Sequence, residues 1–121
     1  MRLVIIESPF RGAADEAPYG HVQYALACVR DCLSRGESPI ASHLLLTRVL
    51  DDTDPLDRAL GIKAGLAWGR VADATVVYTD RGISDGMRQG IEAAETAGRT
   101  VEYRTLPHAS EFYPEATRSL R

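Results

Sequence analysis

A glycine-containing turn in the second half of the chain joins a short apolar run to a helical pattern, and its residues could bind a small molecule. The turn reads Asp80-Arg81-Gly82-Ile83-Ser84-Asp85-Gly86-Met87. Backbone N–H groups at the start of a helix can hold a phosphate, a carboxylate or a ribose hydroxyl. The same residues also suit an ordinary strand-to-helix turn in which Ser84 caps the helix. The candidate ligand-binding residues here are Gly82, Ser84, Gly86 and Met87.

Two carboxylates, Glu7 and Asp80, each follow an apolar run that is predicted to form a buried strand. A carboxylate at such a strand end lies at the crevice where open α/β sheets bind their ligands, so both are candidate catalytic residues. Each also has a structural interpretation. Glu7 could pair with Arg11, and Asp80 could form an Asx-turn with Gly82.

A histidine and the cysteines are the other residues with distinctive chemistry. His43 stands beside Ser42 in the predicted second strand, where it could act as a base, contact a phosphate, or lie in the core as a hydrogen-bonded histidine. Cys28 and Cys32 share one face of a predicted helix, but no matching Cys or His pair completes the four ligands of a structural zinc site. We therefore expect buried free thiols and no bound metal.

The composition excludes several classes of function. The 121 residues are 45% hydrophobic, which is enough for the core of one domain. A formal net charge of −3 with scattered basic residues argues against a nucleic-acid partner. The apolar run after Met1 is too short for a signal peptide, and no segment approaches membrane-spanning length. We therefore expect a cytoplasmic protein without a membrane partner.

Four apolar runs are predicted to be β-strands. Most are continuous rather than alternating, which is typical of strands buried on both faces of a parallel sheet. Polarity alternates in the last run, which favours a position at the edge of the sheet. The predicted strands are Leu3–Ile6, Ile40–Leu46, Ala74–Tyr78 and Val101–Arg104.

Three helices are predicted from apolar spacing and from signals at their ends. They cover residues 21–35, about 55–71 and 85–97. An acidic residue before a proline, as in Asp54-Pro55, starts a helix, and a glycine such as Gly36 or Gly98 ends one. Expected to face the core are Leu56, Leu60, Ala64, Ala67 and Val71 in the second helix, and Met87, Ile91 and Ala94 in the third.

The alternation of strands and helices predicts a single α/β domain over residues 1–121, a Rossmann-like three-layer fold with a mainly parallel sheet of about four or five strands. In such folds the ligand lies beyond the carboxyl ends of the strands. This rule adds further candidate ligand-binding residues: Ser8, Pro9, Phe10 and Arg11 after the first strand, and Ser42 and His43 at the second.

Motifs at three places carry a resemblance to a known superfamily. They are Ser8-Pro9-Phe10-Arg11 after the first strand, Ala72-Asp73 before Val76-Val77-Tyr78, and Asp80, Gly82, Ser84 and Gly86 after it. In these motifs the chain resembles the nucleoside 2-deoxyribosyltransferase superfamily. A second set of motifs spans nearly the whole chain and is similar to a group of small phage and bacterial proteins. It includes Glu7-Ser8-Pro9, Arg35–Pro39, Ala41–Leu45 and Gly82–Met87.

The superfamily resemblance implies a flavodoxin-like fold, a nucleoside or nucleotide site, and cleavage of an N-glycosidic bond in which a glutamate attacks the anomeric carbon. The chain departs from this pattern at the nucleophile, because Gly86 or Gly90 stands in its place. Glu92 lies beyond the first turn of its helix and is expected on the solvated face. The catalytic acid would then come from Glu7 or Asp80.

Three hypotheses about function remain open. The protein is a hydrolase or transferase acting on a nucleotide, a non-catalytic protein that sequesters or senses a nucleotide, or a structural protein with an empty crevice. The polar residues gathered at the strand ends argue against the third. We expect nucleoside or nucleotide binding without a cofactor. The superfamily completes its sites across subunits, so we also expect a homo-oligomer, with the contact on the helix that carries Tyr24 or the one that carries Trp68.

Overall fold

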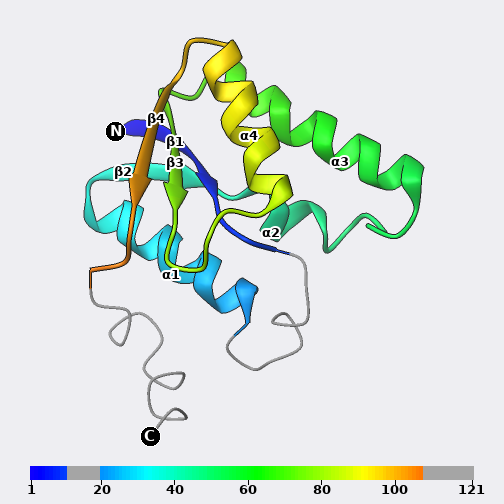
Figure 1. Cartoon of the computed structure of the whole chain (residues 1–121), viewed down its shortest axis with the longest axis horizontal. Helices are drawn as coiled ribbons and strands as arrows, with labels where there is room; N and C mark the ends of the chain where they lie inside the picture. The colour runs from blue at the N-terminus through cyan, green and yellow to red at the C-terminus, as the bar shows by residue number, and fades with distance from the viewer. Residues whose placement is uncertain (11–19, 108–121) are drawn as a thin grey trace, which may run out of the picture.

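A computed structural model of the chain describes residues 1–10 and 20–107 (Figure 1). In chain order the elements are β1 (Arg2–Glu7), α1 (His21–Ser34), β2 (Glu37–Ile40), α2 (Ser42–Leu46), α3 (Pro55–Ala67), the 3-10 helix η2 (Trp68–Arg70), β3 (Ala74–Tyr78), α4 (Asp85–Thr96) and β4 (Thr100–Arg104). The candidate ligand residue Arg11 lies outside the described residues.

The strands form one parallel sheet in the order β2-β1-β3-β4. The chain moves from β1 outward to β2 on one side, and later from β3 outward to β4 on the other, so the order reverses between β1 and β3. Open α/β sheets bind ligands next to this reversal. Glu7 pairs with Val77 across it, which places the end of β1 at the expected site. A parallel sheet between helices confirms the predicted three-layer α/β class.

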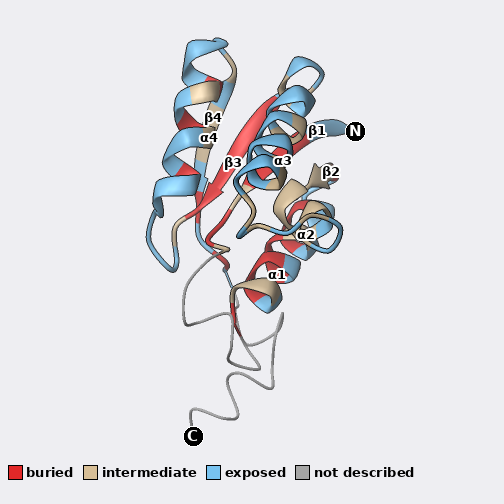
Figure 2. Cartoon of the chain, turned by 90° about the vertical axis from the view of Figure 1, so that its right-hand side faces the viewer, coloured by how far each residue is buried: buried red, intermediate tan, exposed pale blue. Residues whose placement is uncertain are grey.

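Side chains of the central strands pack against helices on opposite faces of the sheet. Val4 and Ile6 belong to the core cluster that includes α1, whereas Val77 packs with Met87 and Ile91 of α4. Figure 2 shows β3 buried between these layers. Because successive residues of a strand point to opposite faces, the last residue of β1 lies on the α4 face.

The predicted helix ends are confirmed where the local signals are strong. Asp54 and Ser84 cap α3 and α4, and each side chain accepts a backbone N–H from the first turn. Gly36 and Gly98 follow α1 and α4 with φ angles of 78° and 71°, a left-handed conformation that glycine adopts at little steric cost. These signals act over a few residues, so the sequence alone is enough to find them.

Two other expectations, on the cysteines and on the edge strand, also agree with the structure. Cys28 and Cys32 are buried and free, and β4 lies at an edge of the sheet. Within residues 1–10 and 20–107, no helix has both the length and the apolar character needed to cross a bilayer.

The predicted second strand, Ile40–Leu46, is wrong. β2 ends at Ile40, and the chain turns into the short helix α2 at Ser42. Pro39 is tolerated in β2 because β2 is an edge strand, where a missing N–H donor costs little. A short apolar run such as Leu44–Leu46 carries no periodicity that separates a strand from a helix.

The predicted core face of the second helix is also wrong. None of its five residues is buried, and Leu56 and Leu60 are 81% and 55% exposed. Figure 2 shows α3 largely exposed. The physical reason is that α3 borders a pocket instead of packing directly on the sheet. Trp68 in η2 is 49% exposed, whereas Tyr24 is fully buried and therefore cannot be the side chain that makes a subunit contact.

Candidate functional site

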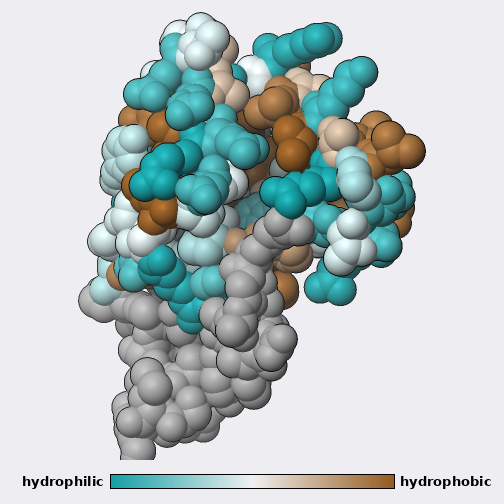
Figure 3. Space-filling model, turned by 45° about the vertical axis from the view of Figure 1, so that its right-hand side comes forward, coloured by the Kyte–Doolittle hydropathy of each residue, from teal (hydrophilic) through white to brown (hydrophobic). Residues whose placement is uncertain are grey.

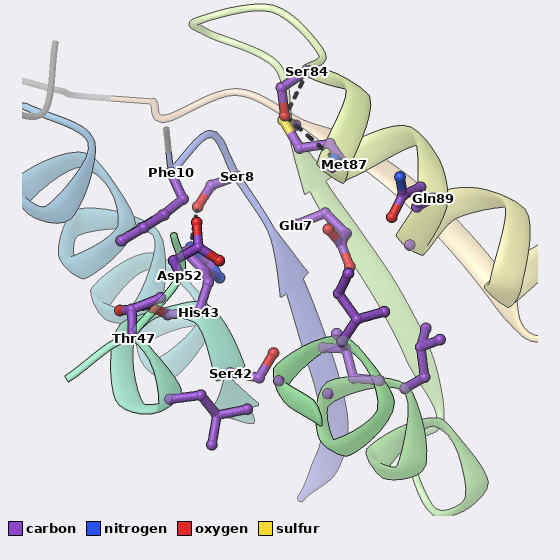
Figure 4. A pocket seen from close by; sticks show the side chains of 18 of the residues that line it. Glu7, Ser8, Phe10, Ser42, His43, Thr47, Asp52, Ser84, Met87 and Gln89 are labelled. Atoms are coloured by element: carbon purple, nitrogen blue, oxygen red, sulfur yellow. Dashed lines mark hydrogen bonds between the residues drawn. The ribbon is translucent and has the colours of Figure 1, made fainter. Parts of the chain in front are cut away.

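A pocket of about 470 Å³ lies between the carboxyl end of β1 and the helices α2, α3 and α4. Small-molecule sites usually measure about 300 to 1,000 Å³. Ile5 of β1 and Ile62 and Leu66 of α3 provide apolar lining. In the space-filling view of Figure 3, apolar side chains lie inside a hollow of the molecular surface. Figure 4 shows polar side chains from β1, α2 and α4 around the same space. The pocket thus combines apolar walls with polar groups at the end of a central strand.

Glu7 is the most unusual polar group in the pocket. It ends β1 and faces the space between α3 and α4 (Figure 4). Its carboxyl makes no hydrogen bond to any other described residue. Burial raises the pKa of Glu7 to about 8, although the positive charge of Arg99 acts in the opposite direction. Glu7 is therefore mainly a protonated, neutral acid at pH 7.

The carboxyl of Glu7 occupies space that Gly90 of α4 leaves empty. A Cβ atom at position 90 would overlap both carboxyl oxygens of Glu7. Gly90 is thus required by a close approach to another side chain, not by its backbone angles. The carboxyl of Glu7, at the end of β1, therefore lies against α4 in the space that a side chain at position 90 would otherwise fill.

Gly90→Ala is expected to lower the free energy of unfolding by about 1 to 3 kcal/mol, because the new methyl group overpacks the site. Gly86→Ala is the matched control, since the nearest atom to a Cβ there is 4.0 Å away. Chemical denaturation should show the loss in the first variant only. Adding Glu7→Ala to Gly90→Ala should restore most of it. An equal effect of both glycine substitutions would contradict the close contact.

Three of the predicted ligand residues come together on the other side of the pocket. The Oγ of Ser8 and the Nε2 of His43 are 3.0 Å apart. The ring of Phe10 meets that of His43 edge to face, with 5.9 Å between the ring centres. Burial lowers the pKa of His43 to about 4, so its ring is neutral at pH 7. A neutral imidazole can donate one hydrogen bond and accept another.

Two further predictions concern residues beside this group. Ser42 lines the pocket at the start of α2, and Gly65 of α3 allows the close approach, because a Cβ there would lie 2.9 Å from the Ser42 Oγ. Pro9 is buried and does not line the pocket. Ser42 and His43 thus follow the carboxyl end of β2, although they begin a helix and not a strand.

The start of α4 supplies Ser84, Gly86 and Met87 to the pocket lining. The Oγ of Ser84 accepts the N–H of Met87 at 3.2 Å, which confirms the interpretation of Ser84 as a helix cap. Its role in binding a ligand remains a prediction. Removing this hydroxyl would also weaken the helix, by about 1 kcal/mol for a typical cap. Gly86 is therefore the better position for testing the pocket.

Asp80 and Gly82 do not line the pocket. The Asp80 carboxylate accepts a hydrogen bond from the Tyr24 hydroxyl at 2.6 Å and from the backbone N–H of Leu106 at 3.1 Å. It thereby ties the end of β3 to α1 and to the segment after β4. Gly82 has a φ of 82° in the turn before α4. The structure gives both residues structural partners and does not bring Asp80 together with Glu7.

Sequence reasoning missed several lining residues. Residue type and spacing alone did not assign them to the ligand site, because their position depends on how α3 stands away from the sheet and on how the end of α4 meets β4. They include Asp52, Asp57, Arg58, Gly61, Gln89 and Arg99. Within the described part of the chain, no group of three or more His, Cys, Asp or Glu residues could hold a metal ion.

A family model described as a domain of unknown function, DUF7768, matches residues 2–104. The chain belongs to the DUF7768 family. The matched region runs from the first residue of β1 to the last residue of β4 and includes every lining residue of the pocket. No curated protein matches the chain. The function of this DUF7768 domain is therefore inferred from the chemistry of its pocket.

Proposed function

We propose that the pocket binds a nucleoside or nucleotide. The observation that carries the proposal is the Glu7 carboxyl, which has no hydrogen-bond partner among the described residues and lines a pocket of about 470 Å³ at the reversal between β1 and β3; burial raises its pKa to about 8. A protonated carboxyl offers a donor and an acceptor together, as a nucleobase or a ribose requires. Phe10 and Ile62 add apolar surface against which a base can lie. The resemblance to the nucleoside 2-deoxyribosyltransferase superfamily points to the same class of ligand.

A second candidate function, cleavage of the N-glycosidic bond, is favoured by the position of Glu7 against Gly90. With a pKa of about 8, Glu7 is suited to give a proton rather than to attack as a carboxylate. Glu7 would donate its proton to the leaving base while the bond between the base nitrogen and the anomeric carbon breaks. Water would then add to that carbon and return its proton to Glu7. The alternative is a non-catalytic protein that sequesters or senses the nucleotide.

A nucleoside or nucleotide is expected to raise the melting temperature, because a ligand bound only by the folded state stabilises it by mass action. A panel of nucleosides, nucleotides and NAD would be tested by thermal shift. Gly86→Val should weaken the effect, because Gly86 lines the pocket and a valine side chain at that position would take up space that the ligand needs. Chromatography of the same mixtures for free base would separate turnover from binding alone. Absence of any shift across the panel would refute the binding proposal.

The partner that fits the outer side of α3 is a second copy of the chain. Leu56 and Leu60 of α3 are 81% and 55% exposed, Trp68 of the following η2 is 49% exposed, and none of the three lines the pocket. Light scattering should give a dimer at micromolar concentration, and Leu60→Glu should convert it to a monomer. Leu33→Glu on α1 is the control, since Leu33 is 49% exposed on the other predicted contact helix. A monomeric parent protein would rule this interface out.

A further inference from the structure

Arg99 lines the pocket from the segment between α4 and β4. Its Nε donates to the Oγ1 of Thr75 at 3.0 Å, and its Nη1 donates to the backbone carbonyl of Gly69 at 3.0 Å. Thr75 is fully buried in β3. Both acceptors are neutral, so they fix the direction of the guanidinium without balancing its charge. The Nη2 makes no hydrogen bond within the described part of the chain.

No carboxylate forms an ion pair with Arg99 among the described residues. Arg104, at the other end of β4, shows the contrast. Its Nη2 lies 2.7 Å from a Glu37 oxygen and 2.9 Å from a Glu102 oxygen. A guanidinium that is partly removed from water normally has such a partner. Among the described residues Arg99 has two neutral hydrogen-bond acceptors and no anionic partner within ion-pair distance.

Glu7 does not fill this role at neutral pH. Its carboxyl feels the charge of Arg99 but is largely protonated at pH 7, because burial raises its pKa to about 8. The other carboxylates that line the pocket, Asp52, Asp57 and Asp85, make no ion pair with Arg99 either. The guanidinium of Arg99 therefore lines the pocket without an ion-pair partner among the described residues.

We infer that Arg99 binds an anionic group of the ligand, and that the ligand is a nucleotide that places its phosphate against this guanidinium. This deepens the proposed function and rests on it. A guanidinium that neighbouring groups already orient can bind a phosphate oxygen with little loss of side-chain entropy. The base and sugar then lie toward Glu7 and Phe10, which line the same pocket. A nucleoside without a phosphate should bind more weakly than the matching nucleotide.

The test compares a nucleoside with its 5′-monophosphate by calorimetric titration. The parent protein should bind the monophosphate at least tenfold more tightly. Arg99→Gln should remove this preference, whereas the control Arg88→Gln, on the exposed side of α4, should keep it. If Arg99→Gln fails to fold, Arg99→Lys is measured in its place. It retains the positive charge and should keep part of the preference for the monophosphate. Inorganic phosphate should compete with the monophosphate in the parent protein and not in Arg99→Gln.

Each result bears on the inference. An unchanged preference for the monophosphate in Arg99→Gln would overturn it, while the proposal that the pocket binds nucleotides would stand. Equal binding of nucleoside and monophosphate by the parent protein would overturn it in the same way. Binding of neither compound by the parent protein would overturn both this inference and the proposed function.

Discussion

Glu7→Gln is expected to stabilise the folded protein at high pH. The difference in free energy of unfolding between the variant and the parent protein should be about 3 kcal/mol more favourable to the variant at pH 9 than at pH 4. The folded pKa of Glu7 is about 8, above its ordinary value of 4.5. The stability that Glu7 contributes to the parent protein is therefore fully present below pH 4.5. It is lost as the pH rises to about 8, since only the unfolded chain releases the Glu7 proton over this range. The figure of about 3 kcal/mol discounts the full linkage for partial solvent access.

His43 gives the opposite dependence on pH. Its folded pKa of about 4 lies below its ordinary value of 6.5, so stability is lost as the pH falls from 6.5 to 4. Between pH 4.5 and 6.5 the two effects oppose each other, and above pH 6.5 only that of Glu7 remains. Urea denaturation at several pH values should show a plateau and then a decline above pH 6.5. Glu7→Gln should abolish the decline. A decline of the same size in the variant would place its cause elsewhere.

Glu7→Gln is also expected to lower the rate at which free base is released by a factor of about 10² to 10⁴, the usual loss when a general acid is removed. Nucleotide binding should change little, since the amide retains a donor and an acceptor. Turnover in the parent protein should fall above about pH 8, as Glu7 loses its proton. The measurements are chromatography of the reaction products and a separate binding titration.

Two variants make this test specific. Glu92→Gln removes an exposed carboxylate from α4 and should leave turnover unchanged. Asp80→Asn weakens the contacts with Tyr24 and Leu106, so it should lower stability more than turnover per folded molecule. Full turnover in Glu7→Gln would refute the catalytic role. Loss of turnover in a well-folded Asp80→Asn variant would instead indicate that Asp80 is the catalytic acid.

Elements with strong local signals could be predicted from the sequence. β3 and the start of α4 match their predicted bounds, because a continuous apolar run and a serine cap act within a few residues. α2 was missed because the run that contains it is too short to show a period. The exposure of α3 depends on the pocket beneath it, and helical periodicity alone predicted a core face.

The candidate site could be predicted only in part. The rule that ligands bind at strand ends selected Glu7, Ser8 and His43, and all three line the pocket. His43 does so although it lies in α2 and not in the predicted strand. The same rule gave no means of telling Glu7 from Asp80, since both follow buried strands. Their difference arises from long-range contacts, namely the space at Gly90 for one and the Tyr24 hydroxyl for the other. Such contacts leave no pattern in a single sequence.

The most direct test of the central claim is an NMR titration that follows the backbone amides as a nucleoside monophosphate is added. Saturable shifts are predicted for residues of the pocket, with Ser8, His43, Gly86 and Gly90 among them. Amides on the exposed side of α1, such as that of Leu33, should not move. Shifts absent at saturating ligand, or confined to α1 and the outer edge of β4, would contradict the claim that this pocket binds nucleotides.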